Sequence, residues 1–390
     1  MRPLVLRGAT VMTGIATMED CSVLVEDGRI SDVFGEKRFR QKSFGPETLV
    51  IDCAGLQVAP GFIDTHIHGF GGFGTEDSSA DAVVAMSEAL AQRGVTAFCP
   101  TLYPMESGAL LEAVRAASSA MGRERGARIM GLHLEGPFLS PERLGVQRPE
   151  TLKPVDLDFM DELWRASEGR ISNMTVAPEL KGMRELALSC AHKGIVLQAG
   201  HTNASYEHMV EGMQAGILHA THLWNAMSQM HHRNPNAVGA VLIHPEFSCE
   251  IIADGQHVHP DLVRLLVRDK PIDRIVLVTD ALKPTGQTEG PLVANGEEVY
   301  LEGGVFHRKA DDVIAGSALT MADGVRKLVS WGLPLSDAVR TASTNPAQVL
   351  RFPRKGYLLP GYDADLVAFD GGLEVKLSVA GGAILKDSIS

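Results

Sequence analysis

The sequence lacks paired cysteines, long apolar runs and an excess of positive charge. Its five cysteines, Cys21, Cys53, Cys99, Cys190 and Cys249, are scattered and odd in number, and no C-x-x-C pair occurs. This pattern argues against a disulfide framework of the kind that stabilises small secreted proteins. We therefore expect reduced, mostly buried thiols in a cytoplasmic protein.

The missing apolar runs and the missing positive charge each exclude a class of partner. The longest apolar segments have the length of a strand, whereas a membrane-spanning helix needs about 20 residues. The N-terminus also has no apolar segment typical of a signal peptide. The net charge is −12, and nucleic-acid binding relies on basic patches. We expect neither a membrane nor a nucleic acid as partner, although one local arginine can still hold a small anion.

What the sequence does contain is an alternation of apolar, strand-like segments with amphipathic, helix-like stretches. This alternation predicts βα units around a parallel sheet, and the number of units matches a (β/α)₈, TIM-like barrel with insertions. A doubly wound sheet is the alternative, but no G-x-G-x-x-G motif follows an early strand. The eight predicted strands span residues 62–65, 95–100, 128–134, 173–177, 195–199, 217–221, 248–253 and 274–279.

The two ends of the chain have a different character. Short β-prone segments and turn signals such as Asp27-Gly28 fill the N-terminal end, and similar segments fill the C-terminal end. The N-terminal segment is too short to close its own sheet comfortably. We therefore predict one small β domain built from residues 1–58 and 346–390, beside a barrel of residues 59–345.

Two histidines, His66 and His68, stand at the end of the first predicted barrel strand. Residues i and i+2 of a strand point to the same side, so both imidazoles should face one way. Neutral imidazole is a common ligand for transition metals. The spacing alone is not specific, because His257 and His259 repeat it. His219 lies earlier within the sixth predicted strand, and we interpret it as structural.

Four further candidates stand at the ends of other predicted strands. Glu135, His201, His222 and Asp280 follow the third, fifth, sixth and eighth strands. In parallel barrels the C-terminal strand ends meet at one mouth and carry the chemistry. Each residue alone has an ordinary explanation, such as a helix-capping role for Asp280. Together with the histidine pair, they form a set of imidazoles and carboxylates suited to a divalent metal.

Several motifs occur in order along nearly the whole chain. They are HIH at 66–68, HLEGPF at 133–138, GHTN at 200–203, THLWNAM at 221–227, ADGQHV at 253–258, VTDA at 278–281, AGSALTM at 315–321, STNPA at 343–347 and GYDADLV at 361–367. This ordered set resembles the amidohydrolase superfamily and, within it, the N-acetylglucosamine-6-phosphate deacetylase family. The resemblance implies the same barrel that the pattern predicts, and it implies that the β domain built from both termini is a β-sandwich.

The resemblance also implies an activity and a metal. It implies hydrolysis of N-acetylglucosamine 6-phosphate to glucosamine 6-phosphate and acetate, in amino-sugar catabolism and cell-wall amino-sugar recycling. The implied metal ligands are Glu135, His201 and His222, with His66 and His68 for a second ion in members that bind one. Asp280 matches the catalytic acid/base. Such ligands suit Zn²⁺ or Fe²⁺, and also Co²⁺ or Mn²⁺, and the choice between one ion and two stays open.

The substrate contacts follow from the same resemblance. They are Val146, Gln147, Asn225, Ala226, Arg233, His257, Ile314, Ala315 and Gly316. The arginine at 233 is expected to reach the phosphate across the interface of a homodimer. One position departs from the family pattern, because Gln147 stands where many members have a histidine that polarises the acetyl carbonyl. Glutamine can donate a hydrogen bond there but carries no positive charge.

Three other functions remain open at this point. The same metal chemistry would serve deacetylation of N-acetylgalactosamine 6-phosphate or hydrolysis of an N-acyl amino acid. Arg233 and the pair Asn225-Ala226 favour a phosphosugar over an amino acid, but they do not fix the configuration at C4. A non-catalytic, metal-binding or metal-free barrel scaffold is a further alternative. It is disfavoured because all six strand-end positions hold competent residues.

Overall fold

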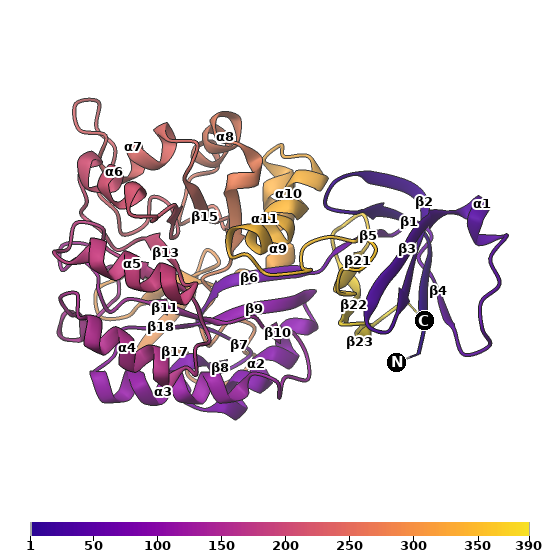
Figure 1. Ribbon diagram of the computed structural model, residues 1–390, viewed down its shortest axis with the longest axis horizontal. Coiled ribbons are helices and arrows are strands. Elements are labelled where there is room, and N and C mark those ends of the chain that lie inside the picture. Colours follow the sequence, from indigo (N-terminus) through magenta and orange to yellow (C-terminus); the bar gives the residue numbers. More distant parts are fainter. Residues whose placement is uncertain (1, 390) are drawn as a thin grey trace.

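The computed structural model describes residues 2–389, so residues 1 and 390 of the two predicted terminal segments lie outside the described part. A barrel and a smaller β domain lie next to each other along the long axis of the molecule, and both chain ends lie in the smaller domain (Figure 1). The predicted fold class, a TIM-like barrel with a small β domain from both termini, is confirmed. No helix in residues 2–389 combines the length and apolarity that a membrane crossing requires.

The barrel is a parallel sheet with eight positions. Its strands are β6 (Phe62–Ile67), β9 (Val95–Leu102), β10 (Arg128–Ile129), β11 (Leu132–Glu135), β12 (Ile171–Val176), β13 (Val196–Ala199), β14 (His219–Ala220), β15 (Ser248–Ile252) and β16 (Ile275–Val278). β10 and β11 both pair with β9, and together they fill one position. All eight predicted strands therefore have a counterpart in the sheet.

The observed strand ends differ from the prediction by one or two residues, and in two strands the difference has a clear cause. The predicted strand 128–134 is interrupted at Gly131, whose φ is +155° and where a Cβ would lie 2.5 Å from the Cβ of Ser172. The chain thus needs glycine at this close approach, and the ladder breaks there. The predicted strand 217–221 shrinks to β14, because the chain leaves the sheet to reach His222, whose φ is +25°.

Helices cover the outside of the barrel (Figure 1). They are α2 (Ala80–Ala91), α3 (Ser107–Ala120), α4 (Leu157–Ala166), α5 (Met183–Lys193), α6 (Tyr206–Gln214), α7 (Asn236–Ile243), α8 (Pro260–Asp269), α9 (Met321–Ser330), α10 (Leu335–Ala342) and α11 (Thr344–Val349). Helix α8 illustrates the local causes. The ring of His259 caps its N-terminus, Pro260 fits the first turn, and Val263 and Leu266 form its buried stripe.

The barrel closes between β6 and β16. Asp64 is fully buried, and its carboxylate accepts hydrogen bonds from the hydroxyl of Thr279 at 2.6 Å and from the backbone N–H of Thr279 at 3.3 Å. Burial raises the pKa of Asp64 to about 7, against these hydrogen bonds. The N–H of Asp280 donates to the carbonyl of His66 at 2.9 Å. These contacts bring His66, His68 and Asp280 to the same mouth.

Eight strands from both chain ends form the small domain. They are β1 (Leu4–Met12), β2 (Thr17–Glu26), β3 (Arg29–Gly35), β4 (Leu49–Asp52), β5 (Gln57–Pro60), β21 (Leu366–Phe369), β22 (Val375–Ala380) and β23 (Ala383–Asp387), with the short helix α1 (Glu36–Phe39) after β3. The two ends join where Val58 pairs with Ala368, between β5 and β21. Leu6, Val23 and Leu377 share one buried core, so neither end buries its apolar face alone.

A small antiparallel sheet forms part of the mouth and was not predicted. It contains β17 (Val293–Ala294), β18 (Glu297–Glu302), β19 (Val305–Arg308) and β20 (Ile314–Ser317). The hairpin of β7 (Gly69–Phe70) and β8 (Phe73–Gly74) is a second such addition. The two-residue turns Asn295-Gly296 and Gly303-Gly304 are hairpin signals that the sequence offered.

Candidate active site

One carboxylate, Glu135, lies at the centre of the predicted site. Its Oε1 atom lies 3.1 Å from Nε2 of His201, 3.2 Å from Nε2 of His222 and 3.4 Å from Nε2 of His66. Its Oε2 atom lies 3.5 Å from Nε2 of His68. The structure therefore brings together five residues that come from four separate strand ends.

Asp280 completes this cluster on the side of the histidine pair. Its Oδ1 atom lies 3.5 Å from Nε2 of His66 and 3.4 Å from Nε2 of His68. His66, His68 and Asp280 form one group with metal-ligand spacing, and His66, Glu135 and His222 form another. His66 belongs to both, so the two groups share a ligand.

The donor set fits a divalent metal. Ligand atoms around a tetrahedral zinc ion with bonds of 2.0–2.1 Å are about 3.3 Å apart, and Nε2 of His201 and Nε2 of His222 are 3.2 Å apart. Two neutral imidazole lone pairs facing each other at this distance repel, unless a cation or a proton lies between them. Nε2 of His66 is buried and has no hydrogen-bond partner in residues 2–389, as expected of an atom that binds a metal.

Buried carboxylates and imidazoles lie close together in the site and shift one another's pKa values. Burial acts to raise the pKa of Glu135, but the imidazoles, His201 first, hold it well below its usual range. Burial also acts to raise the pKa of Asp280, but His66 and His68 outweigh this effect and lower the pKa. Conversely, burial lowers the pKa of His66, but Glu250 and Asp280 raise it well above its usual range. Buried carboxylates of this density need a cation, whether imidazolium or metal.

Different contacts hold the rings of His201, His66 and His68 in place. Nδ1 of His201 donates to the backbone carbonyls of Arg143 and Leu144, each at 3.1 Å. Nδ1 of His66 donates to Oε2 of Glu250 at 2.9 Å. The ring of His68 stacks on Tyr103 with centroids 3.8 Å apart. Each contact fixes a ring plane and thereby directs its Nε2 toward the site.

Four residues of the site have left-handed backbone conformations. The φ angles of His201, His222, Ala226 and Asp280 are +46°, +25°, +48° and +48°. Such angles are uncommon for residues other than glycine, and in folded proteins they concentrate at functional sites. His201, His222 and Asp280 each follow directly after a barrel strand, and Ala226 lies in the loop after β14.

A cavity of about 330 Å³ lies directly above the cluster. The predicted substrate residues Val146, Gln147, Asn225, Ala226, His257, Ile314 and Ala315 line it, together with His68, Tyr103, Glu135, Gly145, His201, His222, Asp280 and Val313. Gly316 is not in this lining. It lies behind the site, where a Cβ would be 2.9 Å from the carbonyl of Asp280, so glycine is needed for this packing.

Gln147 approaches the cluster closely. Its Nε2 donates to Oε2 of Glu135 at 2.5 Å, and its Oε1 is buried without a hydrogen-bond partner in residues 2–389. The residue that departs from the family pattern therefore contacts a predicted metal ligand directly. Its free carbonyl oxygen is one polar group in the cavity that substrate or water can satisfy.

Arg233 lies outside the cavity of its own chain. It is exposed on the loop between β14 and α7, and its backbone N–H donates to Nδ1 of His231 at 3.3 Å. Within the described residues its guanidinium has no ion pair or hydrogen bond. The structure therefore does not bring Arg233 to the cluster within one chain.

Buried polar residues beneath the cluster were missed at the sequence level. His133 lies between the hydroxyls of Thr101 and Thr175, at 3.1 and 2.9 Å, and burial lowers its pKa well below the usual value, so it is neutral. Glu250 has no exposed surface and contacts His66. His133 could have been found, because it precedes Glu135 by two residues and so faces the same side.

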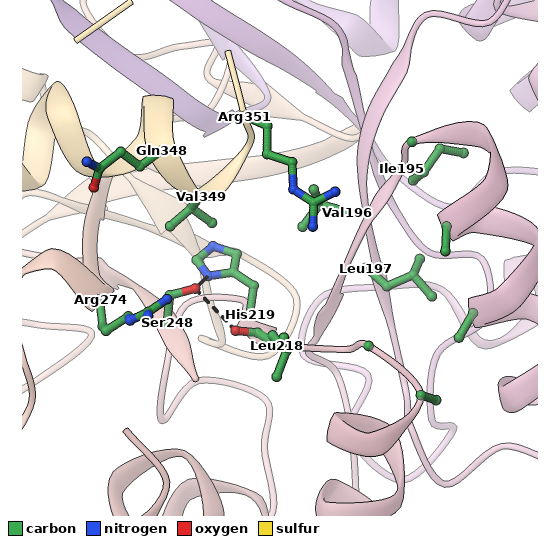
Figure 2. A pocket seen from close by; sticks show the side chains of 15 residues that line it. Ile195, Val196, Leu197, Leu218, His219, Ser248, Arg274, Gln348, Val349 and Arg351 are labelled. Carbon is green, nitrogen blue, oxygen red and sulfur yellow. Dashed lines mark hydrogen bonds between the residues drawn. The ribbon is translucent and has the colours of Figure 1, made fainter. Parts of the chain in front are cut away.

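A second cavity, of about 350 Å³, lies at the opposite end of the barrel, where β13, β14 and β15 begin. Figure 2 shows the ring of His219 in its wall, bonded to the hydroxyl of Ser248 at 2.8 Å, with Arg274 and Arg351 on either side. His219 is thus buried and hydrogen-bonded, in agreement with the structural interpretation. All the predicted metal ligands lie at the other end.

Comparison with known proteins gives consistent matches. The chain matches the Amidohydrolase family over residues 57–387. It is 34% identical to the N-acetylglucosamine-6-phosphate deacetylase of Bacillus subtilis (strain 168), over 98% of this chain and 96% of that protein. It is 33% identical to the N-acetylgalactosamine-6-phosphate deacetylase of Escherichia coli O157:H7, over 82% of this chain and 85% of that protein.

Solved structures give the same result. A variant of the Mycobacterium smegmatis N-acetyl-D-glucosamine-6-phosphate deacetylase, in complex with N-acetyl-D-glucosamine-6-phosphate, is similar with a TM-score of 0.91. The identity is 30%, and the match covers 99% of this chain and 100% of that chain. The likeness therefore includes both the barrel and the small β domain.

Proposed function

Because the chain belongs to the amidohydrolase family, we propose that it hydrolyses N-acetylglucosamine 6-phosphate to glucosamine 6-phosphate and acetate. The observation that carries this proposal is the buried cluster of His66, His68, Glu135, His201, His222 and Asp280 beneath the cavity. The similar Mycobacterium smegmatis protein, which is bound to this sugar phosphate, supports the choice of substrate. The five free, buried cysteines support a cytoplasmic location.

In this proposal Glu135, His201 and His222 hold the main divalent cation. His66 and His68 hold a second ion if two are bound. A cation bound there lowers the pKa of a water molecule and polarises the acetyl carbonyl. We propose Zn²⁺ or Fe²⁺, because imidazole and carboxylate ligands suit both ions.

Asp280 is the acid/base of the proposed reaction. Its lowered pKa keeps it ionised at neutral pH, so its carboxylate can accept a proton from the attacking water. It then returns this proton to the amine nitrogen of the sugar as the C–N bond breaks. The sugar amine leaves readily only when its nitrogen is protonated, because the unprotonated nitrogen would depart as a strongly basic anion. The second proton transfer is therefore as necessary as the first.

The cavity residues bind the sugar and position its acetyl group. The proposed contacts are Val146, Gln147, Asn225, Ala226, His257, Ile314 and Ala315, with Gly316 supporting the backbone of Asp280 from behind. We assign to Gln147 a hydrogen bond from its amide to the acetyl carbonyl, which requires Nε2 to leave Glu135. Because glutamine is neutral, this contact polarises the carbonyl less than an imidazolium would.

Arg233 binds the phosphate across the interface of a homodimer in this proposal. Its exposure, its free guanidinium and its position outside the cavity of its own chain support this arrangement. The phosphate is remote from the amide bond. Its binding energy therefore serves to position the acetyl group rather than to assist bond cleavage.

Deacetylation of N-acetylgalactosamine 6-phosphate is the second candidate, since the chain is 33% identical to an enzyme named for it. Acetate release should be measured on both hexosamine 6-phosphates, with Asp280→Asn as the inactive control and metal content determined on the same samples. A higher kcat/KM for the gluco substrate supports the first candidate, and a higher value for the galacto substrate supports the second. Absence of acetate release from both, in metal-loaded protein, would contradict deacetylation.

A further inference from the structure

Glu250 is a carboxylate buried at the centre of the barrel, directly beneath the cluster. It lies in β15 and has no exposed surface. Its Oε2 atom accepts a hydrogen bond from Nδ1 of His66 at 2.9 Å and from the backbone N–H of His222 at 3.3 Å. A single buried carboxylate thus contacts residues from both sides of the proposed metal site. Burial of a charge is costly unless it is paired, so these contacts are what make its position tolerable.

The remaining contacts of Glu250 leave it little freedom. Its Oε1 atom accepts a hydrogen bond from the side-chain amide of Gln198 at 3.1 Å and lies 3.7 Å from Nε2 of His219. The ring of His219 is in turn held by Ser248, in the wall of the second cavity (Figure 2). The hydrogen bonds from Gln198, His66 and His222 therefore hold both carboxylate oxygens, whereas the approach of His219 is too long for a hydrogen bond.

This geometry determines which ring nitrogen of His66 carries a proton and which has the free lone pair. Because a carboxylate only accepts, the Nδ1 atom that faces Glu250 must carry a proton. In a neutral imidazole the lone pair is then on Nε2, which lies 3.4 Å from Glu135 and 3.5 Å from Asp280. A carboxylate behind a metal-facing histidine fixes its tautomer and ring plane and increases its basicity as a ligand. Nδ1 of His68 and Nδ1 of His222 have no such partner among the described residues.

We propose that Glu250 is a positioning residue that holds His66 with Nε2 toward the cluster, and that the affinity of the cluster for divalent cation depends on it. The inference rests on the proposed metal site, but it does not depend on which sugar phosphate is the substrate. Glu250 touches neither the cavity nor the reacting atoms. It acts only through the orientation of His66 and the backbone of His222.

Glu250→Gln tests the role of the carboxylate directly. The amide of glutamine is neutral, and only one of its two terminal atoms can accept a hydrogen bond. The NH₂ must face either His66 or Gln198, and both present donors to Glu250. Co²⁺ binding to metal-depleted protein should be followed by its visible absorption, with bound metal counted after dialysis. Loss of such a partner typically weakens metal binding by roughly 10–100-fold, and we expect a loss of this size for the most weakly bound ion. Glu250→Asp, which keeps the charge on a shorter arm, should recover part of it.

Ser248→Ala is the matched control. It alters the same strand two residues away and removes the partner of His219, but it leaves Glu250 and His66 intact. Its metal affinity should equal that of the unchanged protein. Equal losses in Ser248→Ala and Glu250→Gln would mean that disturbance of β15, not the contact with His66, weakens the site, and would overturn the proposal.

A second measurement remains informative even if Glu250→Gln fails to fold. In the zinc-loaded protein with labelled histidines, nitrogen NMR should show a bonded, slowly exchanging proton on Nδ1 of His66. An unprotonated Nδ1 in the unchanged protein would refute the proposal, as would unaltered Co²⁺ affinity in folded Glu250→Gln. Failure to release acetate, with the metal and NMR results intact, would instead count against the proposed function alone.

Discussion

Replacement of Asp280 by asparagine isolates the proton transfer from the architecture of the site. The backbone of Asp280 has a φ of +48° and accepts this angle at the end of β16. Asparagine tolerates left-handed angles well, whereas alanine does so poorly, so Asp280→Asn should preserve the loop. The amide has nearly the same size as the carboxyl group, but it cannot take a proton from water at neutral pH.

The size of the effect follows from the role. Proton transfer by a positioned group contributes roughly 10²–10⁴ in rate, or about 2.7–5.5 kcal/mol of barrier. Asp280 lies 3.4–3.5 Å from both imidazoles of the histidine pair, so removal of its charge also weakens cation binding on that side. We therefore expect kcat to fall by at least about 10², with the affinity for the sugar phosphate changed little.

The assay is steady-state acetate release at saturating N-acetylglucosamine 6-phosphate, with bound metal measured on each sample. Excess metal ion in the assay separates loss of metal from loss of proton transfer. If kcat of metal-loaded Asp280→Asn equals that of the unchanged protein, Asp280 is not the acid/base. A tenfold rise in KM at constant kcat would assign it to substrate binding instead.

Three more predictions each concern a single residue. His201→Ala removes an imidazole 3.1 Å from Glu135, so bound metal and acetate release should both disappear, and full metal occupancy would disprove its role as a ligand. Arg233→Ala should raise KM for the 6-phosphate sugar by roughly 10–150-fold, the value of a charge-assisted contact of about 1.5–3 kcal/mol. Any activity on unphosphorylated N-acetylglucosamine should stay unchanged, and equal losses on both substrates would mean that Arg233 supports the loop or the dimer. Asp254 accepts from the ring of His257 at 2.6 Å and raises its pKa, although burial opposes this. A raised histidine pKa stabilises the fold below the unfolded value of about 6.5, and that contribution is lost as the pH rises through the folded pKa. The deficit in Tm of Asp254→Asn should therefore be largest below about pH 6.5 and shrink as the pH rises above it, and a constant deficit would refute the ionic contribution.

The barrel and the positions of the candidate ligands could be predicted because they depend on short-range patterns. His66 and His68 follow from the two-residue period of a strand, and Glu135, His201 and Asp280 follow from their place after apolar runs. The convergence of these groups needs only the rule that parallel strands end at one mouth. The structure places all of them there.

The interior contacts could not be predicted in the same way. Glu250 is a charged residue within a strand, and nothing local distinguishes a carboxylate that faces the barrel axis from one that faces solvent. Its hydrogen bond with His66 joins residues that are 184 positions apart in the sequence. The contact of Gln147 with Glu135 depends likewise on the path of a long loop, which residue patterns do not fix.

The most direct test of the account is a metal titration of the chelator-treated protein, with acetate release from N-acetylglucosamine 6-phosphate measured at each step. The account predicts that the metal-free protein is inactive, and that activity rises with bound metal and levels off when the sites formed by Glu135, His201, His222 and the histidine pair are filled. An undiminished rate in protein shown to hold no metal would contradict it.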